Sequence, residues 1–417
     1  MNLTRIFNMT RLVLPIDLPS GFLKPWRALI AVASLALVFS CTEDSNPELE
    51  KEKFVSVFDN NDYSAVFYPI DIRQTSDEGF LILAEKKIPD SNFRGTYLLK
   101  ADAYGNFVSD LALDDYANPI GDLMEIQNEY YFLTLDMNLG GHLVKVDADL
   151  QGADANPIGG TIYPSAASVD GDGFLLLSYD HVEKESRISR HDKSGNINGG
   201  PVAVGIGAGD DVEEPIMEHV LRTGKRFPFQ VGKISDGLYY FNGFENYSLS
   251  LVFTNLTSPL GVVRGYQDRT GFSAVLPLGN GKFAASRFAF GQNYFLPDLA
   301  LQTNAPGGDS DLGGYVLPEL VPDAHVKIIR TTVGTKNVLV FASDTKSKQI
   351  GLFFYEEGTG KFITSRYLGF SNPFEFSSII VTSDEGLAVL GTTWLAGRFP
   401  RLCIFKLSKD EVADLVE

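Results

Sequence analysis

One unit recurs along the chain: an apolar strand, a tight turn rich in Asp, Asn and Gly, and a second apolar strand. The seven turns are Ser76–Gly79, Gln127–Glu129, Asp170–Gly173, Ser235–Gly237, Gly279–Gly281, Gly334–Lys336 and Ser383–Gly386. Asp, Asn and Gly tolerate the positive φ that short hairpin turns require. Six intervals of about 51 residues separate the first turn from the last. A regular period of this length is typical of a repeat architecture.

Each unit contains further strands after its first hairpin. The third strands are predicted at 97–100, 142–146, 187–190, 249–254, 299–302, 351–355 and 402–406, and the more polar fourth strands at 107–113, 260–265, 315–320 and 362–368. Four strands per unit predict an all-β fold, a seven-bladed β-propeller of four-stranded antiparallel blades. A helical fold is not favoured, because no long stretch keeps a 3.6-residue period. The weak fifth unit leaves six or eight blades as alternatives.

The last unit has no good fourth strand of its own, because Ser408–Val412 is highly charged. A strand-like stretch without a unit, Phe54–Phe58, stands near the start of the chain. We expect this stretch to pair with the last blade and to close the ring, since that leaves no open sheet edge. Residues 53–417 are therefore predicted to form a single propeller domain.

The first forty residues are typical of an export signal. The apolar run Ala28–Phe39 follows Lys24 and Arg27 and precedes Ser40-Cys41. Its twelve residues are too few for a membrane-spanning helix, which needs about 20, and the pattern fits a secretory signal. Val38-Phe39-Ser40-Cys41 resembles the lipobox of bacterial lipoproteins, although that family usually has Leu in place of Val38. The resemblance implies a signal peptide at 1–40 and lipidation of Cys41. The alternative is an uncleaved membrane anchor.

Two further resemblances point to the lipoproteins of Bacteroidota. The acidic tether 41–52 is similar to their surface-export signal, which implies a lipid-anchored protein on the outer membrane that faces outward. Asp77-Glu78-Gly79-Phe80 followed by Leu98–Asp102 and Gly105-Asn106 resembles the repeats of the propellers in this group, as does Leu143–Asp147. This likeness implies a fold and leaves the activity open, because propellers host many unrelated functions.

Composition limits the partners. The chain has 417 residues with 35 Lys and Arg against 53 Asp and Glu, a net charge of −18. This balance disfavours nucleic acid or an anionic lipid surface as the main partner, because both require a basic face. The two cysteines exclude a disulfide scaffold and a Cys-rich zinc site. With Cys41 acylated, Cys403 in the apolar run Leu402–Phe405 is predicted to be a buried, inert thiol.

The binding face follows from the lengths of the loops. Long, irregular connections are predicted at 85–95, 206–227, 243–248, 291–297 and 393–400, all on the face opposite the short hairpin turns. Variable loops on a rigid scaffold commonly carry binding residues. The candidates are Phe93, Arg94, Tyr247, Asn293, Tyr294, Trp394 and Arg398. Aromatic, Arg and amide side chains suit carbohydrate stacking or a protein hot spot; the alternative is that they cap the blade ends.

No metal, cofactor or catalytic motif is predicted. Asp210, Asp211, Glu213 and Glu214 are weak cation candidates, but their spacing is not that of a Ca²⁺ loop, and we expect a solvated acidic loop. Nucleophile-elbow, phosphate-loop and His-Glu-x-x-His motifs are absent. The sequence thus favours a surface-anchored binding or scaffold propeller. Its expected partner is an outer-membrane complex for nutrient uptake or secretion, or an extracellular glycan. The alternative is a polysaccharide-active enzyme, a glycosidase or lyase, whose carboxylate pair need not be close in sequence.

Overall fold

The computed structural model describes residues 51–59, 66–88, 91, 93–159, 163–207, 210–395 and 399–417, without the side chains of 210, 211 and 395. All of them belong to one unit, Glu50–Glu417. The predicted signal peptide, Cys41 and Arg398 lie outside the described residues. Within the described ranges no helix has the length and apolar character needed to span a membrane.

The described residues form an all-β fold of antiparallel sheets. The first sheet has seven strands and combines two repeat units, because one long strand serves both: the first part of β5 pairs with β4 and its second part with β6. Its strands are β2 (Phe67–Gln74), β3 (Phe80–Lys87), β4 (Arg94–Ala101), β5 (Phe107–Ile126), β6 (Glu129–Asp136), β7 (Gly141–Val146) and β8 (Ala153–Pro157).

Four more sheets each correspond to one repeat unit. They are β9 (Tyr163–Asp170), β10 (Gly173–Asp180), β11 (Glu185–Asp192) and β12 (Ile197–Gly205); β13 (Gln230–Ser235), β14 (Leu238–Glu245), β15 (Ser248–Thr254) and β16 (Pro259–Arg264), with β20 (Pro306–Gly308) added in parallel; β17 (Thr270–Gly279), β18 (Lys282–Ala289), β19 (Gln292–Ala300) and β21 (Tyr315–Val316); and β22 (Val326–Val333), β23 (Lys336–Asp344), β24 (Ile350–Glu356) and β25 (Phe362–Leu368). A single 3₁₀ turn, η1 (Asp309–Asp311), precedes β21.

The last sheet joins the two ends of the unit. It contains β26 (Phe374–Val381), β27 (Leu387–Leu395), β28 (Phe399–Leu407) and β1 (Phe54–Phe58), and β1 pairs with β28 from Phe54↔Lys406 to Phe58↔Leu402. The predicted pairing of this first strand with the last unit is therefore observed. The charged segment after β28 forms a helix, α3 (Lys409–Val416), whose start is fixed by a capping box between Ser408 and Glu411.

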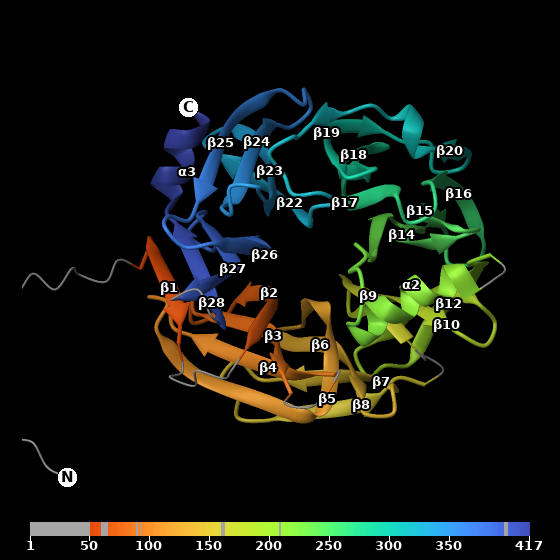
Figure 1. Ribbon diagram of the computed structural model, residues 1–417, viewed down its shortest axis with the longest axis horizontal. Coiled ribbons are helices and arrows are strands. Elements are labelled where there is room, and N and C mark those ends of the chain that lie inside the picture. The colour runs from red at the N-terminus through yellow and green to blue at the C-terminus, as the bar shows by residue number, and fades with distance from the viewer. Residues whose placement is uncertain are drawn as a thin grey trace, which may run out of the picture. The chain divides into compact units, whose positions relative to one another are not determined.

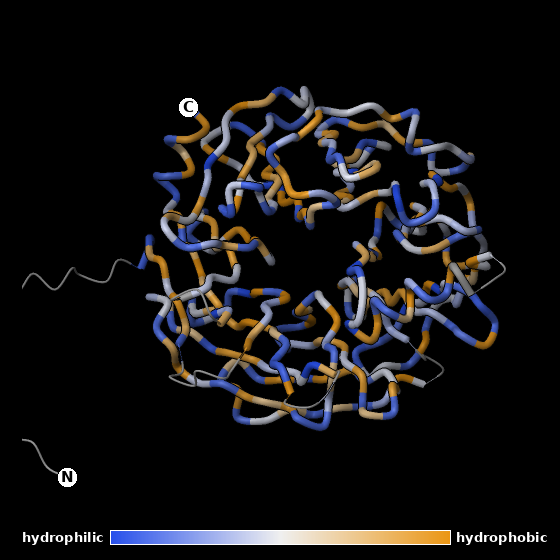
Figure 2. The backbone as a smooth tube through the Cα atoms, in the orientation of Figure 1, coloured by the Kyte–Doolittle hydropathy of each residue, from blue (hydrophilic) through white to orange (hydrophobic). Residues whose placement is uncertain are grey.

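The core lies between neighbouring sheets. One apolar cluster combines residues of β23 and β24 with residues of β27 and β28, and another combines the last sheet with β2 to β4. The first strands of the repeat units lie side by side in the order β2, β5, β9, β13, β17, β22, β26, and β26 also contacts β2. We call these seven the inner strands, counting only the second part of β5, which pairs with β6 (Figure 1). Figure 2 shows apolar stretches along the strands of every sheet, which fits the burial of both sheet faces.

Two hairpin turns have the same sequence and are held by the same kind of Lys–Asp ion pair. Thr-Ser-Asp-Glu-Gly occupies 75–79 and 382–386, with the Glu at a φ of 63° in both. A buried lysine from the third strand reaches back beneath each turn: Lys100 Nζ lies 2.8 Å from Asp77 Oδ1, and Lys406 Nζ lies 2.8 Å from Asp384 Oδ2. This arrangement explains physically why Asp-x-Gly and a later Lys recur together in the sequence.

Candidate binding site at the centre of the connection face

The connections between second and third strands, and those that lead from one sheet to the next, lie at the ends of the strands opposite the hairpin turns. This follows because successive antiparallel strands reverse direction. We call this side the connection face. Three of the long loops predicted on it consist mostly of strand. β14 continues to Glu245 and β19 begins at Gln292, so only two residues remain in each of these two turns. β27 continues to Leu395 and β28 begins at Phe399, so residues 393–395 and 399–400 also belong to strands.

This correction removes one candidate residue from the surface. Asn293 is only 1% exposed. Its Nδ2 donates to Val321 O at 2.7 Å and its Oδ1 accepts from Ala324 N at 3.0 Å. Asn293 therefore fixes the connection that precedes β22. This agrees with the alternative interpretation, in which the side chain caps a blade end.

The aromatic candidates lie apart from one another. Tyr294 is half-buried beneath the Arg287 guanidinium, 4.2 Å from the ring centroid. Tyr247 is exposed on one side, but its ring lies against Gly207, where an added Cβ would come within about 3 Å of it. Phe93 and Trp394 are half-buried. Across the described ranges no hydrogen bond or ring contact joins any two of these four aromatic residues.

The segment predicted to be a solvated acidic loop is a helix. Residues Asp210–Leu221 form a helix, α2, because Val212, Ile216 and Val220 recur every four residues and are buried as one stripe. Glu213 accepts a hydrogen bond from Tyr179 Oη at 2.9 Å and pairs with Lys184. No group of three or more His, Cys, Asp or Glu with the geometry of a metal site occurs in the part of the chain that the structure describes.

The chain after α2 crosses the centre of the connection face. We call residues 222–229 the bridging segment. Arg222 and Arg226 reach Glu85 at the end of β3, and Lys225 Nζ lies 3.0 Å from both Asp268 O and Asp323 Oδ2. The side chains of the segment thus contact both the first sheet and the connections that lead into β17 and β22.

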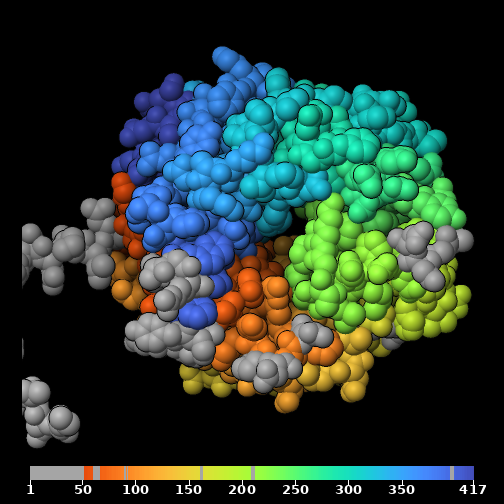
Figure 3. All heavy atoms as spheres, in the orientation of Figure 1, coloured from red at the N-terminus to blue at the C-terminus, as the bar shows by residue number. Residues whose placement is uncertain are grey.

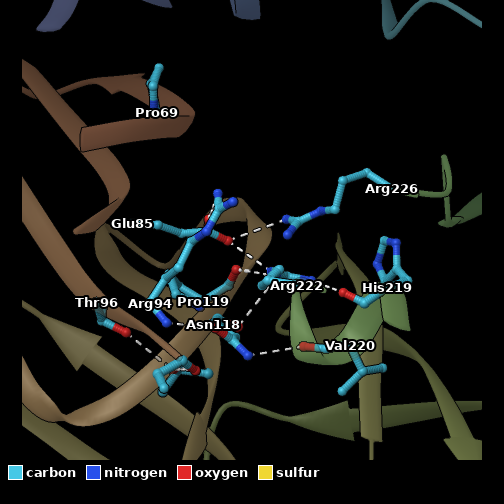
Figure 4. A network of polar contacts seen from close by, with 12 residues as sticks. Pro69, Glu85, Arg94, Thr96, Asn118, Pro119, His219, Val220, Arg222 and Arg226 are labelled. Carbon is cyan, nitrogen blue, oxygen red and sulfur yellow. Dashed lines mark hydrogen bonds and ion pairs between the residues drawn. The ribbon is translucent and has the colours of Figure 1, made fainter. Parts of the chain in front are cut away.

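The centre of this crossing is an arginine cluster made of Glu85, Arg94, Arg222 and Arg226 (Figure 4). Arg222 Nε donates to Glu85 Oε1 at 2.8 Å, and Arg226 Nη2 donates to the same oxygen at 3.3 Å. Arg94 Nη1 donates to Glu85 Oε2 at 2.9 Å. One carboxylate therefore faces three guanidinium groups, so the cluster carries two positive charges in excess.

Arg222 is the structural member of the arginine cluster. Its side chain is 3% exposed, and besides Glu85 it donates to His219 O at 2.7 Å and to Pro119 O at 2.9 Å. Asn118 Nδ2 adds a hydrogen bond to Val220 O at 3.1 Å. Because all three of its nitrogens donate to the protein, Arg222 attaches the end of α2 to β5.

Arg94 and Arg226 are the accessible members. Their side chains are 31% and 45% exposed, and each gives Glu85 a single hydrogen bond. A guanidinium carries five N–H donors, so most donors on both arginines remain available. The Arg94 guanidinium also lies over the Tyr68 ring, 4.0 Å from its centroid.

Burial alone would raise the pKa of Glu85. The charges of Arg226, Arg222 and Arg94 outweigh it and hold that pKa at about 2. His219 in α2 is buried as well, and its Nδ1 accepts a hydrogen bond from Phe227 N at 2.8 Å. Burial and the neighbouring arginines keep the pKa of His219 well below its ordinary value. At neutral pH Glu85 is therefore ionised and His219 is neutral.

A second ion cluster lies on the inner strands. Lys327 Nζ on β22 is 2.8 Å from Asp71 Oδ1 on β2 and 2.8 Å from Ser378 Oγ on β26. Asp71 Oδ2 accepts from Leu123 N at 2.8 Å. Burial opposes ionisation of Asp71, but Lys327, Arg73 and these hydrogen bonds hold its pKa at about 2.

His325 links the two clusters electrostatically. It is exposed, and its ring stacks on Phe376 with 5.4 Å between centroids. Loss of hydration of the ring, followed by the charges of Lys327 and Arg226, lowers the pKa of His325 to about 4. Figure 3 looks onto the connection face and shows a hollow near its centre, between α2 on one side and the sheets of β2 and β26 on the other.

Sequence reasoning singled out Arg94 in this site and missed Glu85, Arg222 and Arg226. The helical spacing of Val212, Ile216 and Val220 was the available signal for α2. Nothing local marks Glu85, which lies in β3, 137 residues before Arg222.

Comparisons with known proteins concern the fold alone. No family model and no curated protein matches the sequence. Among solved structures, the chain is similar to the β-propeller domain of the Trilobed protease from Pyrococcus furiosus (TM-score 0.45, 10% identity, 82% of this chain and 93% of that chain). It is also similar to an α-L-arabinanase from Penicillium chrysogenum (0.43, 13%, 83% and 94%) and to Semaphorin 2a from Drosophila (0.46, 10%, 82% and 74%).

Proposed function

We propose that this protein is a non-catalytic binding propeller with seven blades, closed by β1 and anchored to the outer membrane through a lipid on Cys41. The contacts between the seven inner strands support seven blades. Each inner strand contacts the next one, and the last, β26, contacts the first, β2. The seven-stranded sheet then counts as two blades that share β5. The pairing of β1 with β28 supports closure of the ring at that seam.

The bridging segment carries the functional part of the proposal. It lies across the centre of the connection face, and its arginines engage the one carboxylate of the arginine cluster. A carboxylate with a pKa of about 2 that is shared by three guanidinium groups is a poor proton donor or acceptor near neutral pH. Glu85 is therefore suited to holding the guanidinium groups in place and unsuited to acid–base chemistry.

One observation favours the enzyme as the second candidate. Burial and the charge of Asp71 raise the pKa of Asp122, whereas that of Asp71 is lowered. Two carboxylates with pKa values pushed apart are typical of an acid–base pair. Asp71, however, is buried, and both its oxygens already accept hydrogen bonds from Lys327, Ser378 and Leu123. Its burial and these three hydrogen bonds restrict its access to a substrate, so binding is the better supported function.

The partner is an outer-membrane assembly or an extracellular glycan. Exposed aromatic side chains on the connection face support this, since single rings of this kind contribute strongly to interfaces. Phe290 is 68% exposed at the turn between β18 and β19, and Tyr266 is 57% exposed with its ring centroid 6.2 Å away.

A mild-detergent pull-down from native membranes tests this function. We expect the tagged full chain to recover a stoichiometric companion or a bound polysaccharide, and the double variant Tyr266→Ala, Phe290→Ala to recover less. Recovery of the protein alone would contradict the proposal, as would hydrolysis of polysaccharides by the purified chain. Labelling with an alkyne fatty acid, lost in Cys41→Ser, tests the anchor.

A further inference from the structure

We propose that Arg94 and Arg226 bind the carboxylate groups of an acidic oligosaccharide at the centre of the connection face. This inference rests on the proposed binding function and names the class of ligand. It starts from the excess of charge in the arginine cluster, where three guanidinium groups share Glu85. Arg222 is fully engaged with the protein, so the excess resides on the two accessible arginines.

The geometry of the donors selects an oxyanion. Arg226 uses one donor on Glu85 and exposes 45% of its side chain, and Arg94 is held in place by Glu85 on one side and by the Tyr68 ring on the other. Planar guanidinium groups match a carboxylate with two parallel hydrogen bonds. A carboxylate placed between the two arginines satisfies donors that Glu85 leaves unused.

The charge of the whole chain makes this site distinctive. A protein with a net charge of −18 repels anions over most of its surface. A local cluster with net positive charge on such a surface attracts anions. Anions are therefore attracted to the arginine cluster more strongly than to the acidic surface around it.

The two accessible arginines lie on different elements, Arg94 on β4 and Arg226 on the bridging segment. Two separate guanidinium groups favour a ligand with several carboxylates over a single anion. A uronic-acid oligosaccharide has a carboxylate on every residue and is narrow enough to enter a recess. The carboxylates of a folded protein are spread over a wider surface. The oligosaccharide is therefore the better match for Arg94 and Arg226.

Isothermal titration of the detergent-solubilised full chain tests the inference. The probes are trigalacturonate, neutral galactotriose and inorganic phosphate. We expect binding of trigalacturonate that weakens at least tenfold in 0.5 M NaCl, at least tenfold weaker binding in Arg226→Gln, and weakening of several-fold in Arg94→Lys, which keeps the charge and loses the planar fork. Arg366→Gln, on the exposed side of β25, is the matched control and should bind as the wild type does.

Equal affinity for galactotriose and trigalacturonate would overturn the inference, as would an Arg226→Gln variant with wild-type melting temperature and wild-type affinity. Phosphate binding as tight as that of trigalacturonate would overturn the assignment to a saccharide. Cleavage of trigalacturonate would contradict the non-catalytic function while leaving this site intact. A recovered membrane partner combined with no binding of trigalacturonate would contradict the inference alone.

Discussion

Arg222 Nε lies 2.8 Å from Glu85 Oε1 although 137 residues separate the two in the chain. Both side chains are almost fully buried, so this pair attaches the bridging segment to the first sheet. Removal of one partner leaves the other charge buried with fewer contacts. The pair therefore makes the position of the bridging segment part of the stability of the fold.

Arg222→Ala should lower the free energy of unfolding by about 3 kcal/mol, since breaking a buried ion pair costs about 3–5 kcal/mol and Glu85 keeps Arg94 and Arg226. Urea denaturation at pH 7 measures this. Arg330→Ala removes a partly exposed pair with Glu357 and should cost less than about 1 kcal/mol. Equal losses in the two variants would show that Arg222 does not support the fold.

Glu85→Gln should reduce the dependence of stability on acidic pH. The pKa of Glu85 is lowered from 4.5 to about 2 in the folded protein. A lowered pKa contributes stability that is present above pH 4.5 and is lost as the pH falls toward 2, by about 3 kcal/mol in total. Between pH 5 and pH 2.5 the wild type should therefore lose more stability than Glu85→Gln, as followed by thermal unfolding. Parallel pH profiles would contradict this.

Lys406→Ala should destabilise the last sheet by about 1–2 kcal/mol, because a buried ammonium group that donates to both Asp384 oxygens is lost. The cost is modest because Asp384 remains partly accessible to water. Lys100→Ala tests the matching turn in the first sheet, and Lys361→Ala, on the surface, is the control. Chemical denaturation compares all three. A control as destabilised as the two turn variants would refute the role of the buried lysines.

Gly105→Ala should weaken the packing of β1 and lower the free energy of unfolding. Gly105 has a φ of +78°, and an added Cβ would meet the Phe54 ring at 2.3 Å. Gly237 has a similar φ of +72° with open space around it, so Gly237→Ala measures the backbone cost alone, about 1 kcal/mol. We expect Gly105→Ala to cost at least about 1 kcal/mol more and to increase proteolytic cleavage near Phe54. Equal costs would show that the ring moves aside freely.

Strand patterns and turns were predictable because they are local. Phe362–Leu368 is a strand with the predicted bounds, and the predicted pairing of Phe54–Phe58 is observed, since an apolar strand without a partner has few places to pair. The buried state of Cys403 also followed from its apolar neighbours and is confirmed.

The errors occurred where local signals competed. Asn293 was placed in a loop because it follows Gly291 in the predicted connection 291–297, but its side chain holds the backbone near Ala324 inside the protein. The acidic residues before Pro215 favoured the prediction of a loop, so the helical spacing of Val212, Ile216 and Val220 was overlooked. The arginine cluster could not be predicted at all, because its members lie on separate elements that only the tertiary fold brings together.

The pairing of β1 with β28 has a consequence for biosynthesis. The strand that leaves the ribosome first among the described elements has its partner in the strand that leaves last, with Phe54 opposite Lys406. Contacts between residues so distant in sequence form late. β1 therefore has no partner until β28 has been synthesised, and a product truncated before Phe399 lacks the strand with which β1 pairs.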